Sequence, residues 1–230
     1  MTGIILKLIA AVSMAIDHAG LMLFPQASWM RAVGRLAFPI FAYFIAEGFY
    51  YTRSRLRYFL RIFLLGTACE AVYLLAGYPL ELGILFTFSF SIILMSLLDR
   101  AKRALAKPDG RAESAAWFAA FLLCAAAIWF LSTRVFLDYG FFGVMLPVFT
   151  SLFTEKQHRY AAFAAGLTLL CAVDSAPSFS DIQSLSLAAL GLLALYNGKE
   201  GRSRMKHFFY IFYPAHLAAL WAIRQLTMLF

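Results

Sequence analysis

Long apolar runs separated by short polar segments extend along the whole chain. Most runs are close to the length of about 20 residues that a helix needs to cross a bilayer. The pattern predicts an all-α polytopic integral membrane protein, a bundle of about nine transmembrane helices at residues 4–24, 29–51, 58–77, 80–98, 115–132, 136–153, 160–174, 182–197 and 207–228. No linker or second domain interrupts these runs, so we expect a single transmembrane domain over residues 1–230.

Basic residues alternate between the predicted loops, and this alternation sets the orientation. Fifteen of the 20 Lys and Arg residues fall on one side, namely Arg53, Arg55, Arg57, Arg61, Arg100, Lys102, Arg103, Lys107, Arg111, Lys156, Arg159, Lys199, Arg202, Arg204 and Lys206. By the positive-inside rule this side is cytoplasmic. We therefore expect the amino terminus inside and the carboxyl terminus outside.

The composition supports this class of protein and excludes others. Hydrophobic residues make up 63% of the chain and charged residues 14%, which is too apolar for an average soluble domain. The formal net charge of +8 follows from the basic cytoplasmic loops. We therefore expect no nucleic-acid partner, and membrane lipids with anionic head groups are the default partners of the Arg53 to Arg61 cluster.

The first predicted helix carries ionisable side chains in a stretch that is otherwise apolar. Asp17 and His18 interrupt the run, and Lys7 precedes His18 by 11 residues. Eleven residues are close to three helical turns, so Lys7 and His18 project from one face about 16 Å apart along the axis. Ionisable residues inside a membrane indicate a functional site. Snorkelling of Lys7 at a helix end is the structural alternative.

The second predicted helix supplies a cation at the depth of Asp17. Arg31 and Arg35 enter from the opposite side of the membrane, which brings Arg35 level with Asp17 and predicts an ion pair. An unpaired charge at mid-bilayer costs about 2.5 to 3.5 kcal/mol. Small residues would let the two helices approach closely, and Pro39 is expected to loosen the second helix below Arg35. The small residues are Ala15, Ala19, Gly34 and Ala37.

Three further groups of polar residues lie in apolar runs. Glu70 reaches about the depth of His18 and is the candidate to orient it, whereas Glu47 is expected at the interface, facing Arg53 to Arg61. Tyr210, Tyr213 and His216 recur at i, i+3 and i+6 and line one side of the last helix; aromatic packing around one histidine is the alternative. Hydrogen bonding between helices is expected for Thr87, Ser89 and Ser91.

Several motifs together resemble the TraX family. They are the Asp17–His18 pair, the segment RAVGRLAFPIF from Arg31 to Phe41, Glu47–Gly48, and FYIFYPAH from Phe209 to His216. The family is named for the conjugal-transfer protein that acetylates the amino terminus of F pilin. It is similar to multispan acyltransferases of cell-surface sugars, in which a basic residue, ten intervening positions and a histidine mark the first helix. Lys7 and His18 fit that spacing.

The resemblance implies a membrane-bound acyltransferase in the bacterial cytoplasmic (inner) membrane. Its co-substrate would be cytoplasmic acetyl-CoA, with no metal, and its partner an acceptor on the outer side such as a pilin or a surface glycan. The catalytic candidates are His18, Asp17, Arg35, Glu70, His216 and Tyr213. The candidates for binding acetyl-CoA are Lys7, Arg31, Arg53, Arg55, Tyr43 and Tyr210.

The residues leave two questions open. Either His18 or His216 could be the general base. A proton-coupled transporter or carrier is the alternative function, because Asp17, His18, Arg35 and Glu70 would also suit a proton relay, although the sequence shows no inverted repeat. A passive membrane scaffold is a third class, for which buried charges would have no use.

Overall fold

The computed structural model describes residues 1–75, 77, 79–173, 180–201 and 208–227, with only the backbone of Ser180 and Asp181. Arg202, Arg204 and Lys206, which were assigned to the cytoplasmic face, lie outside the described residues. Contacts divide the chain into two compact units. The first unit combines Met1–Phe44 with Leu167–Phe230, and the second is Ile45–Gly166.

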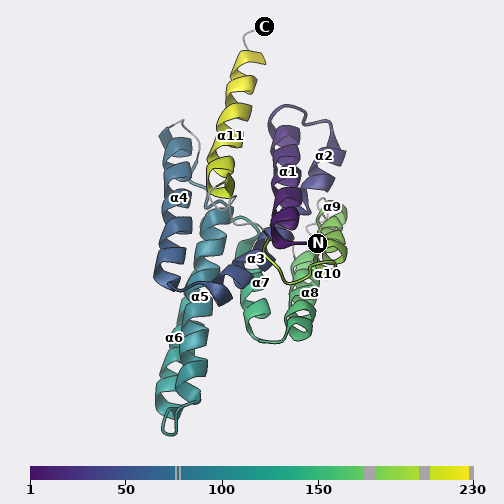
Figure 1. Ribbon diagram of the computed structural model, residues 1–230. Coiled ribbons are helices and arrows are strands. Elements are labelled where there is room, and N and C mark those ends of the chain that lie inside the picture. Colours follow the sequence, from purple (N-terminus) through teal and green to yellow (C-terminus); the bar gives the residue numbers. More distant parts are fainter. Residues whose placement is uncertain (76, 78, 174–179, 202–207, 228–230) are drawn as a thin grey trace. The chain divides into compact units, whose positions relative to one another are not determined.

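The described residues form helices and no strands, as the apolar pattern predicts (Figure 1). In chain order the helices are α1 (Gly3–Met22), α2 (Ser28–Gly34), α3 (Ala37–Tyr51), α4 (Arg55–Leu75), α5 (Ile84–Leu105), α6 (Arg111–Ser132), α7 (Gly140–Ser151), α8 (Lys156–Val173), α9 (Ser180–Ser184), the 3-10 helix η1 (Leu185–Leu187), α10 (Ala188–Ala194) and α11 (Phe208–Thr227). The boundary between the units falls inside α3 and α8.

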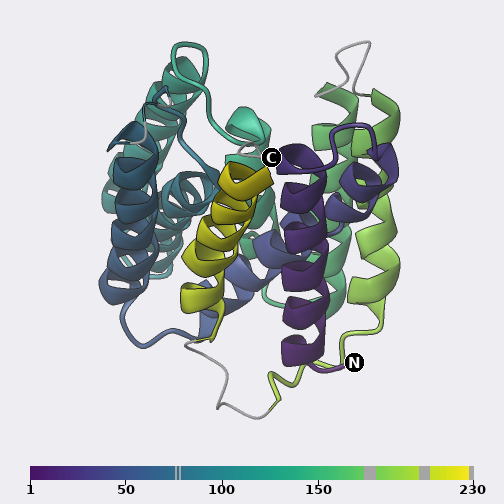
Figure 2. The same cartoon turned by 90° about the horizontal axis from the view of Figure 1, so that it is seen from above.

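In the first unit α1 packs against α2 and α11. Figures 1 and 2 both show α11 beside α1, although the two helices are almost 190 residues apart in sequence. Gly20 of α1 allows the close approach of α2, because a Cβ at this position would lie 2.7 Å from Cβ of Met30. This packing brings the ionisable residues of α1 next to both neighbouring helices.

The second predicted span is interrupted at Arg35–Leu36, between α2 and α3. Pro39 accounts for the interruption, because it has no N–H to donate to the Arg35 carbonyl and its ring clashes with that carbonyl. Pro39 itself sits in the first turn of α3, where a proline is tolerated. The predicted loosening near Arg35 is therefore confirmed.

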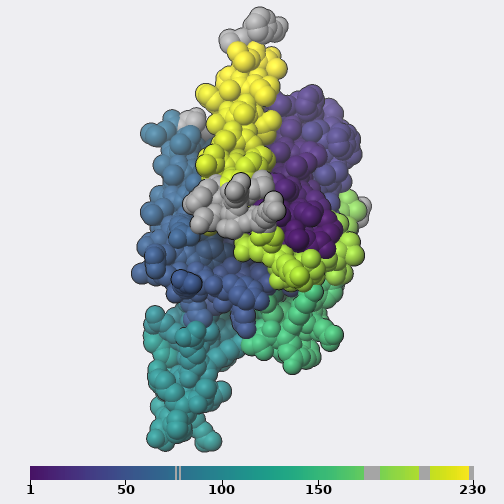
Figure 3. Space-filling model, viewed as in Figure 1, coloured from purple at the N-terminus to yellow at the C-terminus, as the bar shows by residue number. Residues whose placement is uncertain are grey.

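In the second unit α5 packs against α4, α6 and α7. Its core includes Leu94, Met95, Val144 and Leu146, all nearly inaccessible to solvent. In contrast, the outer face of α6 exposes large apolar side chains such as Leu123 and Trp129, and the hairpin tip between α5 and α6 projects beyond α4 (Figure 3). Such continuous apolar exposure is what a lipid-facing helix requires.

The hydroxyl groups along α5 all make hydrogen bonds, but the predicted bonding beyond the helix is confirmed for Thr87 and Ser91 and not for Ser89. Thr87 Oγ1 donates to the Asp138 carbonyl at 2.7 Å, and Ser91 Oγ lies 2.8 Å from the Val144 carbonyl of α7. Ser89 Oγ instead donates within α5, to the Leu85 carbonyl. Two of the three hydroxyls therefore link α5 to the segment that contains α7.

Five spans of the described chain are long and apolar enough to cross a membrane: Gly3–Met22, Ser28–Tyr51, Arg55–Leu75, Ile84–Leu105 and Arg111–Ser132. They make this a multi-pass membrane protein. The other predicted spans correspond to shorter or more polar helices, such as α7 with 12 residues and the broken α9–η1–α10 segment. The structure thus bears out the helical class, while the count of nine spans and the orientation stay predictions.

The start of α1 is held by the segment at residues 195–201. The N–H groups of Gly3 and Ile4 donate to the carbonyls of Lys199 and Glu200 at 2.8 and 2.9 Å, and Lys7 Nζ lies 3.3 Å from Glu200 Oε1. These contacts put Lys199 at the same end of the first unit as the amino terminus. The predicted topology assigns both to the same side of the membrane.

Candidate functional site

Two histidines from opposite ends of the chain meet in the first unit. His18 Nδ1 on α1 and His216 Nε2 on α11 are 2.8 Å apart, and the two rings are nearly parallel, with centroids separated by 5.0 Å. His216 Nδ1 lies 2.8 Å from the Phe212 carbonyl oxygen, and the Phe212 ring stacks on His216. Both histidines are catalytic candidates from the sequence, and the packing of α1 against α11 brings them into contact.

The hydrogen bonds assign the tautomers of the pair. A carbonyl oxygen can only accept, so His216 Nδ1 must carry a proton and donate it to Phe212. Neutral His216 then has its lone pair on Nε2, which accepts from His18 Nδ1–H. Neutral His18 consequently keeps its lone pair on Nε2. This nitrogen is the atom of the pair that is able to take up a proton from a third molecule.

Next to the histidine pair, one carboxylate accepts hydrogen bonds from two arginines. Asp17 Oδ2 accepts from Arg31 Nη1 at 2.9 Å, and Asp17 Oδ1 accepts from Arg35 Nη2 at 3.2 Å. The ion pair of Asp17 with Arg35 was predicted from their depths, and the structure confirms it. The two guanidinium groups thus share one carboxylate in a largely buried cluster.

Gly34 makes this cluster possible. A Cβ at position 34 would overlap the Asp17 side chain, so any larger residue there would displace the carboxylate. The small residue at this position was predicted to allow α1 and the following helix to approach closely, and it does so directly over Asp17.

Gln183 is a member of the cluster that the sequence did not indicate. Its side chain is buried, and its Oε1 accepts from Arg35 Nη1 at 3.2 Å. Arg35 Nε also donates to the Arg31 carbonyl at 3.3 Å. Gln183 lies in the short helix α9, and an amide inside a predicted transmembrane run was the one signal that could have marked it. Its Oε1 fixes the orientation of the Arg35 guanidinium.

The remaining candidates of the first unit take different places. Tyr213 lies edge-on against His216, with ring centroids 5.8 Å apart, and so belongs to the histidine pair. Tyr210 is half-buried one turn earlier on α11. Tyr43 is buried edge-on against Tyr196 at 6.2 Å. Lys7 pairs with Glu200 and lies 4.9 Å above the Phe44 ring, at the other end of α1 from His18.

Three candidates belong to the second unit. Glu70 Oε1 accepts from the Glu81 N–H at 2.9 Å, and its proposed role toward His18 stays a prediction. Arg53 and Arg55 begin the Arg53 to Arg61 cluster, but they line different hollows of the surface. Glu47 was expected to face this cluster; its Oε2 lies 2.7 Å from Arg159 Nη2, a partner that the sequence did not suggest.

Lipid-facing helices and a sheltered group of histidine, carboxylate and arginine side chains define a polytopic membrane protein with an intramembrane ionisable site. The model of the family described as TraX protein matches residues 2–224. The chain therefore belongs to the TraX family.

Two relatives match nearly the whole chain, and a third matches a short part of it. The chain is 28% identical to the probable fimbrial assembly protein FimC, serogroup H1, of Dichelobacter nodosus, over 94% of this chain and 92% of that protein. It is 27% identical to Protein TraX of Escherichia coli, over 94% of this chain and 84% of the relative. An uncharacterized protein of Rickettsia prowazekii is 46% identical over 20% of this chain. No solved structure gives a significant match.

Proposed function

We propose that this protein is an integral-membrane acetyltransferase that moves an acetyl group from acetyl-CoA to an acceptor on the other side of the bacterial cytoplasmic membrane. The observation that supports it most is the hydrogen-bonded series from His18 through His216 to the Phe212 carbonyl. A histidine held in one tautomer by a second residue is the arrangement that orients the general base in catalytic triads.

In the proposed reaction His18 is the general base and His216 is a positioning residue. The acceptor nitrogen or oxygen attacks the carbonyl carbon of the thioester while His18 Nε2 takes up the acceptor's proton. The new bond to the acetyl carbon forms as the carbon–sulfur bond breaks, and the proton then passes from His18 to the departing thiolate. His216 Nε2 accepts from His18 Nδ1–H throughout, which stabilises the imidazolium that forms.

The negative charge that develops on the carbonyl oxygen needs a hydrogen-bond donor, and the cluster around Asp17 offers two guanidinium groups. Arg35 is held through Nε, Nη1 and Nη2 by Arg31, Gln183 and Asp17. Arg31 contacts Asp17 through Nη1 alone among the described hydrogen bonds. Arg31 is therefore the better candidate to stabilise the developing charge, with Tyr213 as the alternative hydroxyl donor.

The acceptor that suits this site best is an amine of a pilin-like protein. The relative from Dichelobacter nodosus is named as a fimbrial assembly protein, and the family is associated with pilin acetylation. An α-amine has a reference pKa of about 7.7 to 8.0, so a useful fraction is already neutral near pH 7. A sugar hydroxyl of a surface glycan would depend more strongly on His18.

The acetyl-donor end of the proposal keeps the residues inferred from sequence. Acetyl-CoA supplies an activated thioester, and basic side chains would attract its phosphates from the cytoplasm. Arg53 and Arg55 are the candidates in the second unit, and Lys7, Arg31, Tyr43 and Tyr210 those in the first.

The first test is transfer of a labelled acetyl group by the purified protein. We expect the protein in lipid nanodiscs to move radiolabel from acetyl-CoA to a pilin-derived peptide with a free amino terminus, and not to the same peptide with a blocked terminus. The alternative carrier function predicts the reverse result, namely flux of protons or solute across vesicles with no labelled product. Vesicle flux without acetylation would contradict the proposal.

Replacement of His216 separates positioning from base catalysis. We expect His216→Phe to lower kcat by about tenfold to a hundredfold with little change in KM, because His18 loses the acceptor that holds its tautomer. His216→Gln keeps an acceptor oxygen and should recover part of the activity. The measurement is steady-state kinetics of both variants; equal losses would show that the hydrogen bond is not what matters.

A further inference from the structure

A polar cavity lies wholly inside the second unit, between residues of α3, α4, α5, α7, α8 and the loop that joins the last two. We call it the Arg159 pocket. It has a volume of about 210 Å³, and its polar lining includes Arg55, Asp99, Lys102, Arg103 and Arg159. The cations come from three predicted cytoplasmic loops, so three positive-inside signals converge on one cavity.

The cations of the Arg159 pocket are held in place by the protein. Arg159 is buried, with its guanidinium 2.7 Å from Glu47 Oε2 and 5.3 Å from the Tyr50 ring. Arg55 pairs with Asp99 and lies 4.6 Å above the Phe49 ring. A ligand would meet side chains that are already ordered, which lowers the entropic cost of binding.

Lys102 and Arg103 complete the lining from the last turn of α5. Lys102 Nζ donates to the carbonyls of Ser151 and Leu152 at 3.1 and 2.8 Å, where α7 ends. Arg103 Nε lies 2.8 Å from Asp99, and its side chain is 69% exposed. Arg103 is therefore the cation of the pocket that can be changed with the least effect on folding.

Topology alone does not account for this arrangement. The positive-inside rule needs cations somewhere in a cytoplasmic loop, not a buried one. Burial of the Arg159–Glu47 pair costs desolvation free energy, and this cost can exceed the Coulombic attraction between the two side chains. In the part of the chain that the structure describes, the four cations are matched by two carboxylates, Asp99 and Glu47, which leaves an excess of two positive charges at the pocket. The excess indicates an anionic ligand.

The size of the cavity and the chemistry of its donors specify that anion. About 210 Å³ is below the roughly 300 to 1,000 Å³ of sites that enclose a whole drug-sized ligand, so it would enclose only part of a larger molecule. Guanidinium groups match phosphate oxygens in a bidentate geometry. We propose that the Arg159 pocket binds the diphosphate group of a nucleotide-type ligand. That the ligand is coenzyme A rests on the proposed function; the diphosphate chemistry rests on the pocket.

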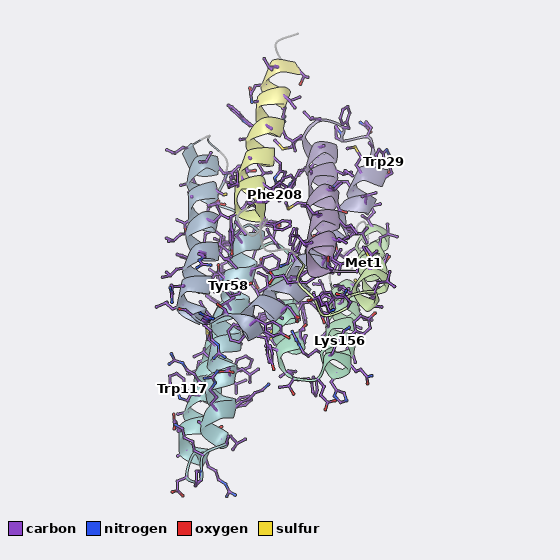
Figure 4. All side chains as sticks on the ribbon, viewed as in Figure 1. Met1, Trp29, Tyr58, Trp117, Lys156 and Phe208 are labelled. Carbon is purple, nitrogen blue, oxygen red and sulfur yellow. The ribbon has the colours of Figure 1, made fainter. Side chains whose placement is uncertain are left out.

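The neighbouring hollow provides a matched control. It is lined by Thr52, Arg53, Ser54, Arg57, Tyr58 and Arg61, and Tyr58 stands at the start of α4 (Figure 4). Arg61 is exposed and lies outside the Arg159 pocket. Arg61→Glu therefore makes the same charge reversal as Arg103→Glu, on the same unit but away from the proposed site.

The experiment is isothermal titration of the full-length protein in phosphatidylcholine nanodiscs. We expect coenzyme A and dephospho-coenzyme A, which share the diphosphate, to bind within about threefold of each other, and pantetheine, which has no phosphate, at least about tenfold more weakly. Arg103→Glu should weaken the binding of coenzyme A about tenfold, whereas Arg61→Glu should change it less than about twofold.

Three results would overturn the proposal: equal binding of coenzyme A and pantetheine, equal effects of the two charge reversals, or a loss of affinity when only the 3′-phosphate is removed. Native mass spectrometry tests a lipid phosphate as the source. The lipid outcome is that Arg103→Glu loses bound phosphatidylglycerol, that Arg61→Glu keeps it, and that neither variant changes the affinity for coenzyme A. That result would assign the pocket to a lipid head group. Coenzyme A binding through the pocket without acetyl transfer would leave this proposal standing and contradict the proposed function alone.

Discussion

His18→Ala is expected to lower acetyl transfer by about a hundredfold to ten-thousandfold, the range of rate that a positioned general base supplies. The Phe212 carbonyl sets the tautomers of both histidines. In these tautomers the available lone pair is on His18 Nε2, which can take up the proton of the attacking group. In the intact pair the other three ring nitrogens are already engaged, because both Nδ1 atoms donate and His216 Nε2 accepts from His18. The measurement is kcat/KM for labelled acetyl transfer by the purified variant.

The size of the loss also depends on the acceptor. An α-amine is partly neutral near pH 7 and can attack without a base, whereas a hydroxyl is a poor nucleophile until its proton is removed. The loss on His18→Ala should therefore be larger for a sugar hydroxyl than for a peptide amine. Measurement of both acceptors with the same variant gives the comparison, and equal losses would point to a structural role for His18.

His158→Ala is the control for this experiment. His158 lies on α8 in the second unit, with its side chain 61% exposed and its ring 3.1 Å from Glu155. It has no part in the proposed chemistry, so its replacement should leave activity within about twofold. If His158→Ala and His18→Ala lose activity to the same extent, the loss reflects folding or handling, and His18 would not be the base.

The sequence predicted individual site residues better than their partners. Asp17 and Arg35 could be paired because both lie in adjacent helices joined by a short loop, where depth follows from the rise per residue. His18 and His216 are 198 residues apart, and no periodicity connects α1 with α11. Their contact comes from tertiary packing, which a single sequence does not encode in a local pattern.

Hydropathy predicted apolar segments, and helices differ from these at their ends. The predicted span 80–98 becomes α5, which begins at Ile84 and continues through the charged residues to Leu105. The last turns of α5 carry Asp99, Lys102 and Arg103. The Arg159 pocket therefore lies where the helix continues beyond the apolar run. The segment 182–197 divides into three short helices, and Gln183 at its start was overlooked because the apolar average concealed one polar residue.

Removal of the Asp17 carboxylate should have the largest effect on stability. Asp17→Ala would remove the carboxylate that Arg31 and Arg35 share, in a cluster whose side chains are 11 to 26% exposed. Breaking a buried pair costs about 3 to 5 kcal/mol, and the partial exposure of Arg31 favours the lower value. We expect a loss of about 3 kcal/mol, or roughly 6 to 12 °C in Tm. Asp109→Ala, at an exposed carboxylate, should shift Tm by less than about 2 °C.

A double-mutant cycle tells whether charge is the cause. In the wild type, Arg31→Gln removes a favourable contact with Asp17 and should lower Tm. In an Asp17→Asn background the same change removes one of two repelling guanidinium groups, so it should raise Tm instead. This reversal of sign follows only if the carboxylate balances both arginines. Additive losses in the cycle would mean that Asp17 stabilises the protein through packing against Gly34, where a Cβ would overlap it, and not through its charge.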